Sequence, residues 1–142
     1  MKLLVAILLL FFQASQPPEK WECCKDSTPL PKEQLVQVKP SELKERVLVC
    51  AVPRLPPTFD GQTTLFLEVE VDEEGKIRCA RVVSGGQNSI MRDAGLAAAK
   101  QWRFEPWLVE GKPKPYLSIL PLMVSWDTEK AGAQCPKEKR RA

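Results

Sequence analysis

Five cysteines are the side chains of this 142-residue chain with the most reactive chemistry. No two of them are spaced as Cys-x-x-Cys, and the one adjacent pair has poor geometry for joint binding of a tetrahedral metal ion. Disulfide formation is the other use of such residues, and disulfides persist in oxidising compartments. The odd number leaves one thiol free or paired between molecules, and the connectivity stays open. The disulfide candidates are Cys23, Cys24, Cys50, Cys79 and Cys135.

Acid–base and metal chemistry lack their usual residues. Histidine, the commonest general base and the commonest zinc ligand, is absent from the sequence. The densest acidic cluster, Asp72, Glu73 and Glu74, directly precedes Gly75 and is typical of a solvated turn. No nucleophile motif or separate pair of acids accompanies it. We therefore expect no catalytic residue, no metal site and no cofactor, and the chain is predicted not to be an enzyme.

The charge balance argues against nucleic-acid binding. The 21 basic and 18 acidic residues give a formal charge of +3, which is no strong basic footprint. A hydrophobic content of 44% is ordinary for one globular domain of this length. Basic residues gather in residues 137–141, where a solvated, flexible tail is favoured over contact with an anionic surface.

Residues 1–15 have the plan of a secretory signal peptide. Met1 and Lys2 give a positive start, residues 3–12 are apolar, and cleavage is expected after Ala14 or Ser15. The apolar run is half of the roughly 20 residues that a membrane-spanning helix needs. The alternative is an uncleaved N-terminus that anchors the chain. Export favours disulfides as the state of the cysteines.

A strand, a turn and a second strand form the clearest pattern in the chain. Residues 64–72 alternate between apolar and charged side chains, which predicts a half-buried strand of an antiparallel sheet. Residues 72–75 predict a hairpin turn with Gly75 at positive φ. Residues 76–84 return as the second strand, whose mixed alternation indicates either a bulge or burial on both faces. The predicted core positions of the first strand are Leu65, Leu67, Val69 and Val71.

A short helix and a last strand follow. Asn88 or Ser89 is expected to cap the helix, with Asp93 in its first turn and Gly95 at a tight contact with the sheet. Its predicted buried face consists of Ile90, Ala94, Ala97, Ala98 and Gln101. Large rings in residues 102–107 are placed where the helix meets the sheet, and residues 109–113 form a turn. Residues 115–126 are the last strand, at an edge or bulged, because Pro121 cannot donate a ladder hydrogen bond. The fold class predicted is α+β, a two-layer arrangement of a small antiparallel sheet and a short helix.

The segments before the hairpin have weaker signals. Residues 16–32 are irregular, and residues 33–38 can form a short strand. Residues 40–45 suggest one helical turn with Ser41 as its cap, residues 47–52 are extended, and residues 53–57 predict polyproline-like backbone. The predicted organisation is a signal peptide at 1–15, a Pro- and Cys-containing segment at 16–46, a domain at 47–127 and a basic flexible tail at 128–142.

The ordered set of motifs from about Val47 to Trp126 resembles the C-terminal domain of TonB, the energy-transducing protein of Gram-negative bacteria. The alanine-rich helix that runs into Trp102, Arg103, Phe104 and Pro106 is the most diagnostic part. The other matching parts are residues 53–56, 60–62, 65–71, 72–75, 81–85 and 91–100. The resemblance covers a little over half of the chain.

This resemblance implies a protein-binding function in the periplasm. Such domains bind TonB-dependent receptors of the outer membrane, and the receptor's extended N-terminal segment adds as a strand to the edge of the domain. In this chain the resemblance places the receiving edge on the last strand and a contact strip next to it. The implied partner-binding residues are Pro53, Arg54, Leu55, Pro56, Tyr116, Ser118, Leu120, Leu122, Val124 and Trp126.

Three features differ from the family pattern. Leu55 stands where tyrosine is common, and only residues 57–59 separate Pro56 from Asp60, where a helix is usual. Full transducers also have a long membrane anchor that engages ExbB and ExbD, which the apolar run of residues 3–12 is too short to supply. The alternative function is a disulfide-stabilised secreted protein without a transport role, in which the odd cysteine and an open strand edge permit a homodimer.

Overall fold

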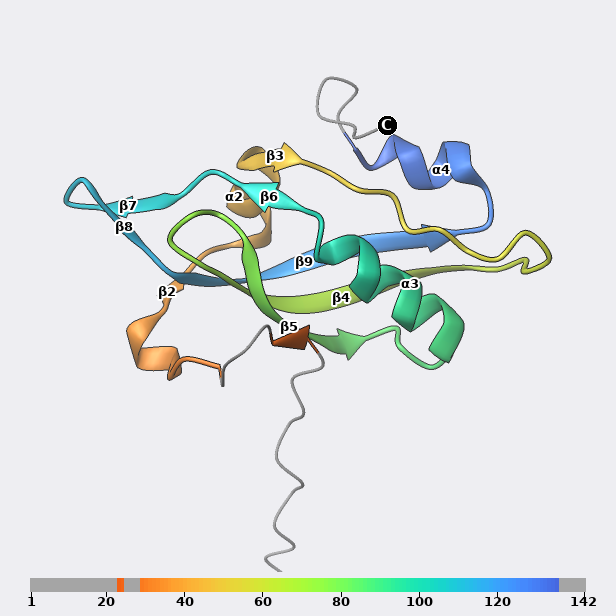
Figure 1. The fold of residues 1–142 in the computed structure, drawn as a ribbon, viewed down its shortest axis with the longest axis horizontal. Coiled ribbons are helices and arrows are strands. Elements are labelled where there is room, and N and C mark those ends of the chain that lie inside the picture. Colours follow the sequence, from red (N-terminus) through yellow and green to blue (C-terminus); the bar gives the residue numbers. More distant parts are fainter. Residues whose placement is uncertain (1–22, 25–28, 136–142) are drawn as a thin grey trace, which may run out of the picture.

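The computed structural model describes residues 23–24 and 29–135 (Figure 1). The expected signal peptide, most of residues 16–32 and the basic residues 137–141 lie outside this part. A sheet with helix α3 (Ser89–Ala99) against one face confirms the predicted α+β class. Within the described residues, no helix has both the length and the apolar content to cross a membrane.

Five strands form the main sheet. All neighbours pair antiparallel except the last two, which run parallel. The hairpin and the last strand of the domain supply its centre, and short segments from the N-terminal part of the chain supply both of its edges. In sheet order the strands are β1 (Cys23–Cys24), β5 (Ile77–Ser84), β4 (Gln62–Val71), β9 (Tyr116–Ser125) and β2 (Val36–Gln37).

The β4–β5 hairpin follows the predicted alternation on β4. The register between the two strands shifts at two points, so the second strand is bulged. These shifts place Ile77, Ala80 and Val82 opposite the buried side chains of β4, which explains the mixed alternation of β5. The fully buried apolar side chains of β4 are those predicted: Leu65, Leu67, Val69 and Val71. Glu70, predicted on the charged face, is fully buried as well.

The turn between β4 and β5 requires glycine. Gly75 has a φ of 84°, and a β-carbon there would overlap the carbonyl oxygen of Phe104. The Asp72 carboxylate accepts hydrogen bonds from the amides of Glu74 and Lys76, both at 2.9 Å. The predicted hairpin turn is therefore confirmed, and its acidic cluster has a structural use.

Helix α3 begins where the sequence predicts but buries a different face. The Asn88 side chain caps it by accepting from the Met91 amide at 3.1 Å. Asp93 lies beyond the first turn, contrary to expectation. Ile90 is 44% exposed, and the predicted buried face is wrong by about one residue of rotation. Nearly every position of this helix is apolar or small, so the periodicity defined no single face. The buried residues are Met91, Gly95, Leu96, Ala98 and Ala99.

Gly95 makes the tight contact that its position in the helix predicts. A β-carbon there would overlap Leu65 Cδ1 and lie 3.4 Å from Val124 Cγ2. Both of those side chains are fully buried. Because glycine adds no atoms at this point, the helix can lie close to β4 and β9.

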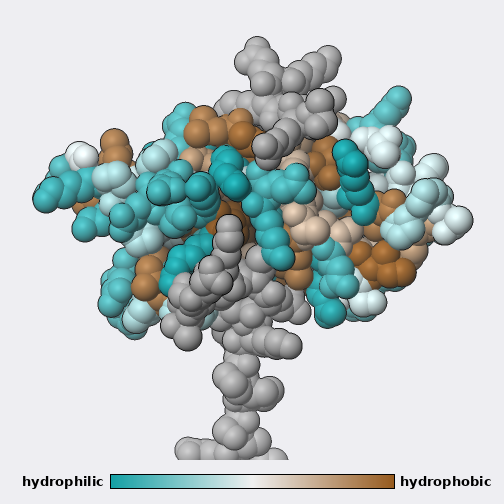
Figure 2. Space-filling model, in the orientation of Figure 1, coloured by the Kyte–Doolittle hydropathy of each residue, from teal (hydrophilic) through white to brown (hydrophobic). Residues whose placement is uncertain are grey.

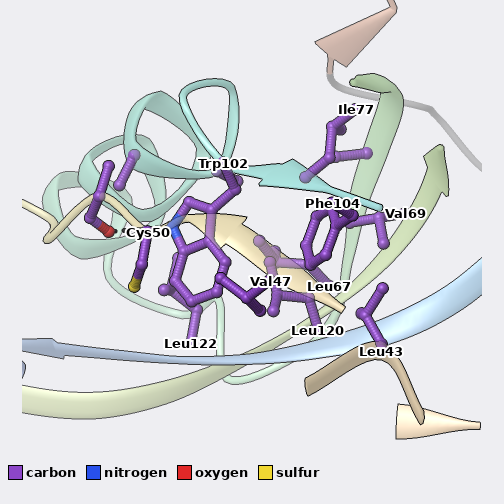
Figure 3. Close-up of a cluster of buried hydrophobic side chains, with 14 of the residues drawn as sticks. Leu43, Val47, Cys50, Leu67, Val69, Ile77, Trp102, Phe104, Leu120 and Leu122 are labelled. Carbon is purple, nitrogen blue, oxygen red and sulfur yellow. Dashed lines mark hydrogen bonds between the residues drawn. The ribbon is translucent and has the colours of Figure 1, made fainter. Parts of the chain in front are cut away.

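The core fills the space between the sheet and the chain that leaves α3 (Figure 3). Trp102 and Phe104 are stacked with ring centroids 6.1 Å apart, which confirms the predicted ring packing where the helix meets the sheet. Trp102 Nε1 donates to the Ala51 carbonyl at 2.9 Å, so the polar end of this buried ring has a partner. Strand β6 (Arg103–Phe104) pairs with β3 (Val47–Val49). Strand β3 is the first half of the extended segment predicted at residues 47–52.

A small hairpin projects from the sheet at the left of Figure 1. It consists of β7 (Trp107–Val109) and β8 (Lys112–Lys114), with Glu110 and Gly111 at positive φ in the turn. The Arg46 guanidinium lies 4.1 Å from the centroid of Trp107 and donates to the Pro106 carbonyl at 3.1 Å. This contact fixes the base of the hairpin to the domain.

The N-terminal elements belong to the folded unit. A 3₁₀ turn (Lys32–Gln34) precedes β2, so only part of the predicted strand 33–38 is extended. Helix α2 (Pro40–Glu45) confirms the predicted helical turn, but its cap is Lys39 and not Ser41. Pro40 takes the first helical position, where its missing N–H costs nothing.

The C-terminal end also folds back on the domain. Residues 128–142 were expected to be a flexible tail, but Thr128–Ala133 forms helix α4, capped by the Asp127 carboxylate. Cys135 then forms a disulfide with Cys50 across 85 residues of sequence. Cys79 is disulfide-bonded as well.

Candidate functional site: the outer edge of β9 and the groove at its end

Strand β9 alternates its backbone groups between two neighbours. The Trp126 amide, just past the strand, donates to the Gly61 carbonyl at the start of β4. On the other side, the carbonyls of Pro115 and Leu117 accept from β2. Since successive residues of a strand direct their N–H and C=O groups to opposite sides, the odd-numbered residues of β9 form its outer edge.

The first residues of this outer edge are occupied by β2. Val36 and Gln37 align with Tyr116 and Leu117 in parallel register. The Val36 amide donates to Pro115 O at 3.2 Å, and a second bond of 2.9 Å reaches Leu117 O from the Val38 amide. The last strand is therefore not an edge strand along its first residues, which corrects the prediction drawn from Pro121.

The far part of the outer edge is occupied by one side chain. Gln134, just after α4, accepts from the Met123 amide through Oε1 and donates to the Met123 carbonyl through Nε2, both at 2.8 Å. The side-chain amide thus takes the place of a backbone partner. Because the next residue, Cys135, is bonded to Cys50, this contact is covalently fastened to the domain.

Between these two contacts, Leu120 and Pro121 line a cleft. Among the described residues, no strand pairs with this part of the outer edge. Pro121 has no N–H and is exposed. Because no described strand pairs with the outer edge of β9 at this point, the missing donor leaves no ladder hydrogen bond unmade. The cleft has a volume of about 330 Å³ and is lined by Pro40, Ser41, Leu43, Lys44, Val47, Trp102, Leu120, Pro121 and Gln134.

A larger groove of about 600 Å³ lies at the C-terminal end of β9. The proline-rich segment forms one wall, and Ser125, Trp126 and the start of α4 form the other. This groove brings the predicted contact strip and Trp126 together. Its lining is Val52, Pro53, Arg54, Leu55, Pro56, Pro57, Phe59, Ser125, Trp126, Thr128 and Gly132.

The predicted site residues divide into two groups. Arg54, Pro56 and Trp126 are exposed, Leu55 is half-buried and Pro53 is buried along the groove. The others face the hydrophobic core: Tyr116, Ser118, Leu120, Leu122 and Val124 are each at most 4% exposed. Their side chains cannot reach a partner, so a partner would meet β9 through its outer edge.

Trp126 is the large apolar side chain at the groove. It is 59% exposed, which is unusual for tryptophan in a folded domain. In the view of Figure 2 the coloured surface is mostly hydrophilic, and its hydrophobic residues form separate patches rather than one large patch. A large ring beside prolines and Phe59 is suited to packing against an extended peptide.

Tyr116, at the β2 end of the edge, has a structural role. Its hydroxyl donates to the Glu105 carbonyl at 3.3 Å, and its ring lies against Trp107. Burial raises its pKa to about 12; the nearby Arg46 charge opposes this shift, and Asp72 and Glu105 add to it. At neutral pH the phenol is uncharged and suits the core.

Sequence reasoning missed the two contacts that close the edge. A short strand was predicted at residues 33–38, but nothing local identified β9 as its neighbour. Gln134 gave no signal, because a polar residue in a charged tail has no periodicity to interpret. Within the described residues, no group of three or more His, Cys, Asp or Glu side chains could hold a metal ion.

One comparison with known proteins gives a match. Residues 60–123 match the family model described as the Gram-negative bacterial TonB protein C-terminal. The match begins before β4 and ends within β9, just under half of the chain. No curated protein and no solved structure matches the chain.

Proposed function

Since the domain at residues 60–123 belongs to the TonB C-terminal family, we propose that it docks the extended N-terminal segment of an outer-membrane TonB-dependent transporter. The family is a non-enzymatic, periplasmic one and implies involvement in TonB-dependent transport. The mode of docking that we propose is strand addition at the outer edge of β9, with the groove at residues 53–56 and Trp126 as the neighbouring contact strip.

The observation that supports strand addition most is the pairing of β2. The outer edge already forms two main-chain hydrogen bonds with an extended segment, at 2.9 and 3.2 Å. An edge with this geometry is competent to hold a strand, and main-chain bonds supply affinity with little demand on sequence. The groove then supplies the side-chain contacts that favour one peptide over another.

The test is calorimetric titration of the exported protein with synthetic peptides from the N-terminal segments of transporters of the same organism. A second peptide with proline at alternate positions lacks the amide donors and should not bind. Failure of every transporter peptide to bind at millimolar concentration would refute the proposal.

A pair of variants tests the groove. Trp126→Ala should weaken peptide binding by about tenfold, the usual scale for an aromatic side chain at the centre of an interface. Leu108→Ala is the matched control, because Leu108 is 58% exposed and belongs to the small hairpin and not the groove. Equal losses in both variants, or none in Trp126→Ala, would exclude the groove from the binding site.

A further inference from the structure

We propose that residues 35–38 are an internal strand that closes the receiving edge of β9 in the free protein and leaves it when a partner's extended segment binds. The identity of the partner rests on the proposed function. The closure rests on contacts within this chain alone.

Hydrogen bonds and two buried side chains hold this segment in place. Its bonds to β9 include the main-chain hydrogen bonds from the amides of Val36 and Val38, and one in which Ser118 Oγ donates to the Val38 carbonyl at 2.7 Å. Leu35 and Val38 are 7% and 6% exposed, so two aliphatic side chains are buried with it. These are contacts that another extended segment with apolar side chains can reproduce.

The two ends of the outer edge differ in how firmly they are held. Gln134 holds Met123 at the far end, and the adjacent Cys135–Cys50 disulfide is buried, with both cysteines at most 2% exposed. That contact stays closed under oxidising conditions. Strand β2 is two residues long, and Lys39 follows it with extended backbone before α2 begins. The β2 end is therefore where the edge opens.

The pairing of β2 with β9 defines the chemistry of the partner. A segment that replaces β2 must be extended, run parallel to β9, and offer amides at the places of Val36 and Val38. Val38 packs into the core while Gln37 is exposed. The partner should therefore present an aliphatic side chain at the Val38 position, with polar side chains tolerated one residue before it.

The test removes one hydrogen bond from β2. Val36→Pro deletes the amide that donates to Pro115 O, and the residue before it is already extended, as proline requires. Gln37→Pro is the control, because alternate amides point to opposite sides and that of Gln37 faces away from β9. The probe is a fluorescently labelled peptide with the sequence of residues 33–39. Its binding to each variant is measured by fluorescence anisotropy.

We expect Val36→Pro to bind this probe at least about fivefold more tightly than the unchanged chain, which is the scale of one hydrogen bond. Gln37→Pro should bind like the unchanged chain. If Val36→Pro does not unfold cooperatively, Val38→Ala serves instead, because it shortens a buried side chain of the internal segment while the probe keeps its own valine. Equal probe binding in variant and unchanged chain, or no binding to either, would overturn the internal strand.

A transporter peptide separates this inference from the proposed function. Binding of that peptide to all variants with equal affinity, together with no probe binding, would leave the proposed function standing and reject the internal strand. Binding of the probe without binding of any transporter peptide would support the internal strand and reject the proposed function. Tighter binding of both peptides to Val36→Pro is the expected result.

Discussion

Gly95 is the residue at which two opposed energies can be compared directly. Replacing glycine by alanine inside a helix adds about 1 kcal/mol of helix propensity. The new methyl group would overlap Leu65 Cδ1 in a fully buried core, and overpacking of this kind costs about 1–3 kcal/mol. We expect Gly95→Ala to lower the free energy of unfolding by about 1 kcal/mol, measured by urea denaturation.

Ala97→Ser is the control for Gly95→Ala. Ala97 is an exposed residue of the same helix, so its replacement should change the free energy of unfolding by less than about 0.5 kcal/mol. A more stable Gly95→Ala protein would show that helix propensity dominates and that α3 does not lie as close to β4 as described.

Ionisation of Tyr116 makes the free energy of unfolding depend on pH in the alkaline range. Its pKa is about 12 in the folded protein and about 10 in the unfolded chain. Between these values the unfolded state releases the proton and the folded state keeps it, so stability is full below pH 10 and falls as pH rises. The expected slope is about 1 kcal/mol per pH unit between pH 10 and pH 12.

The measurement is direct, because Tyr116 is the only tyrosine of the chain. The ultraviolet absorbance of its phenolate should appear near pH 12 in the folded protein and near pH 10 in urea. Tyr116→Phe should remove this contribution to the alkaline slope. Titration of the folded phenol at its ordinary pKa would contradict the burial of Tyr116.

At the scale of elements, the end of α4 is fastened to β9 by Gln134 and to the segment after β3 by the Cys50–Cys135 disulfide. We expect the double variant Cys50→Ser and Cys135→Ser to lose about 2–5 kcal/mol of stability, the usual range for a native disulfide. Gln134→Ala should lose about 1–3 kcal/mol, because it leaves two backbone groups of Met123 without their partner. Both changes are read from thermal or urea unfolding.

Hydrogen exchange distinguishes these two variants from a general loss of stability. The Met123 amide should exchange faster in both, while the Val69 amide in the middle of β4 keeps its protection relative to the global unfolding. Ala133→Ser, at an exposed position of α4, is the control. Unchanged exchange at Met123 in Gln134→Ala would show that another group satisfies this amide.

The elements that could be predicted from the sequence are those defined by local patterns. Alternation predicted β4, the acidic turn with Gly75 predicted the hairpin, and Asn88 predicted the start of α3. The parts that could not be predicted depend on partners distant in sequence: β2 against β9, and Gln134 against Met123. The face of α3 was misassigned because small apolar residues surround it on almost every side.

The same distinction applies to the candidate site. The structure brings residues 53–56 and Trp126, which the family resemblance implied as contacts, together along one groove. The alternate positions of β9 from Tyr116 to Val124 turned out to be core, since a strand's side chains and its hydrogen-bonding edge point in different directions. The pattern of side chains therefore predicted the strand itself but not which of its atoms form the outer edge.

At the scale of the whole molecule, segments from both ends of the chain close a sheet whose centre is the β4–β5–β9 unit. Strand β2 covers one end of the outer edge and α4 the other, and both lie outside the family match at residues 60–123. The folded unit is thus larger than the matched domain. The proposed strand addition uses the outer edge of this larger unit.

The amide of Ile119 provides the most direct test of strand addition, because it faces outward between the two covers. Hydrogen exchange of the whole chain should be followed by NMR with and without a transporter peptide. We predict that the Ile119 amide becomes protected when the peptide binds, while the amides of Val36 and Val38 lose protection. Peptide binding that leaves Ile119 unprotected would contradict strand addition at β9.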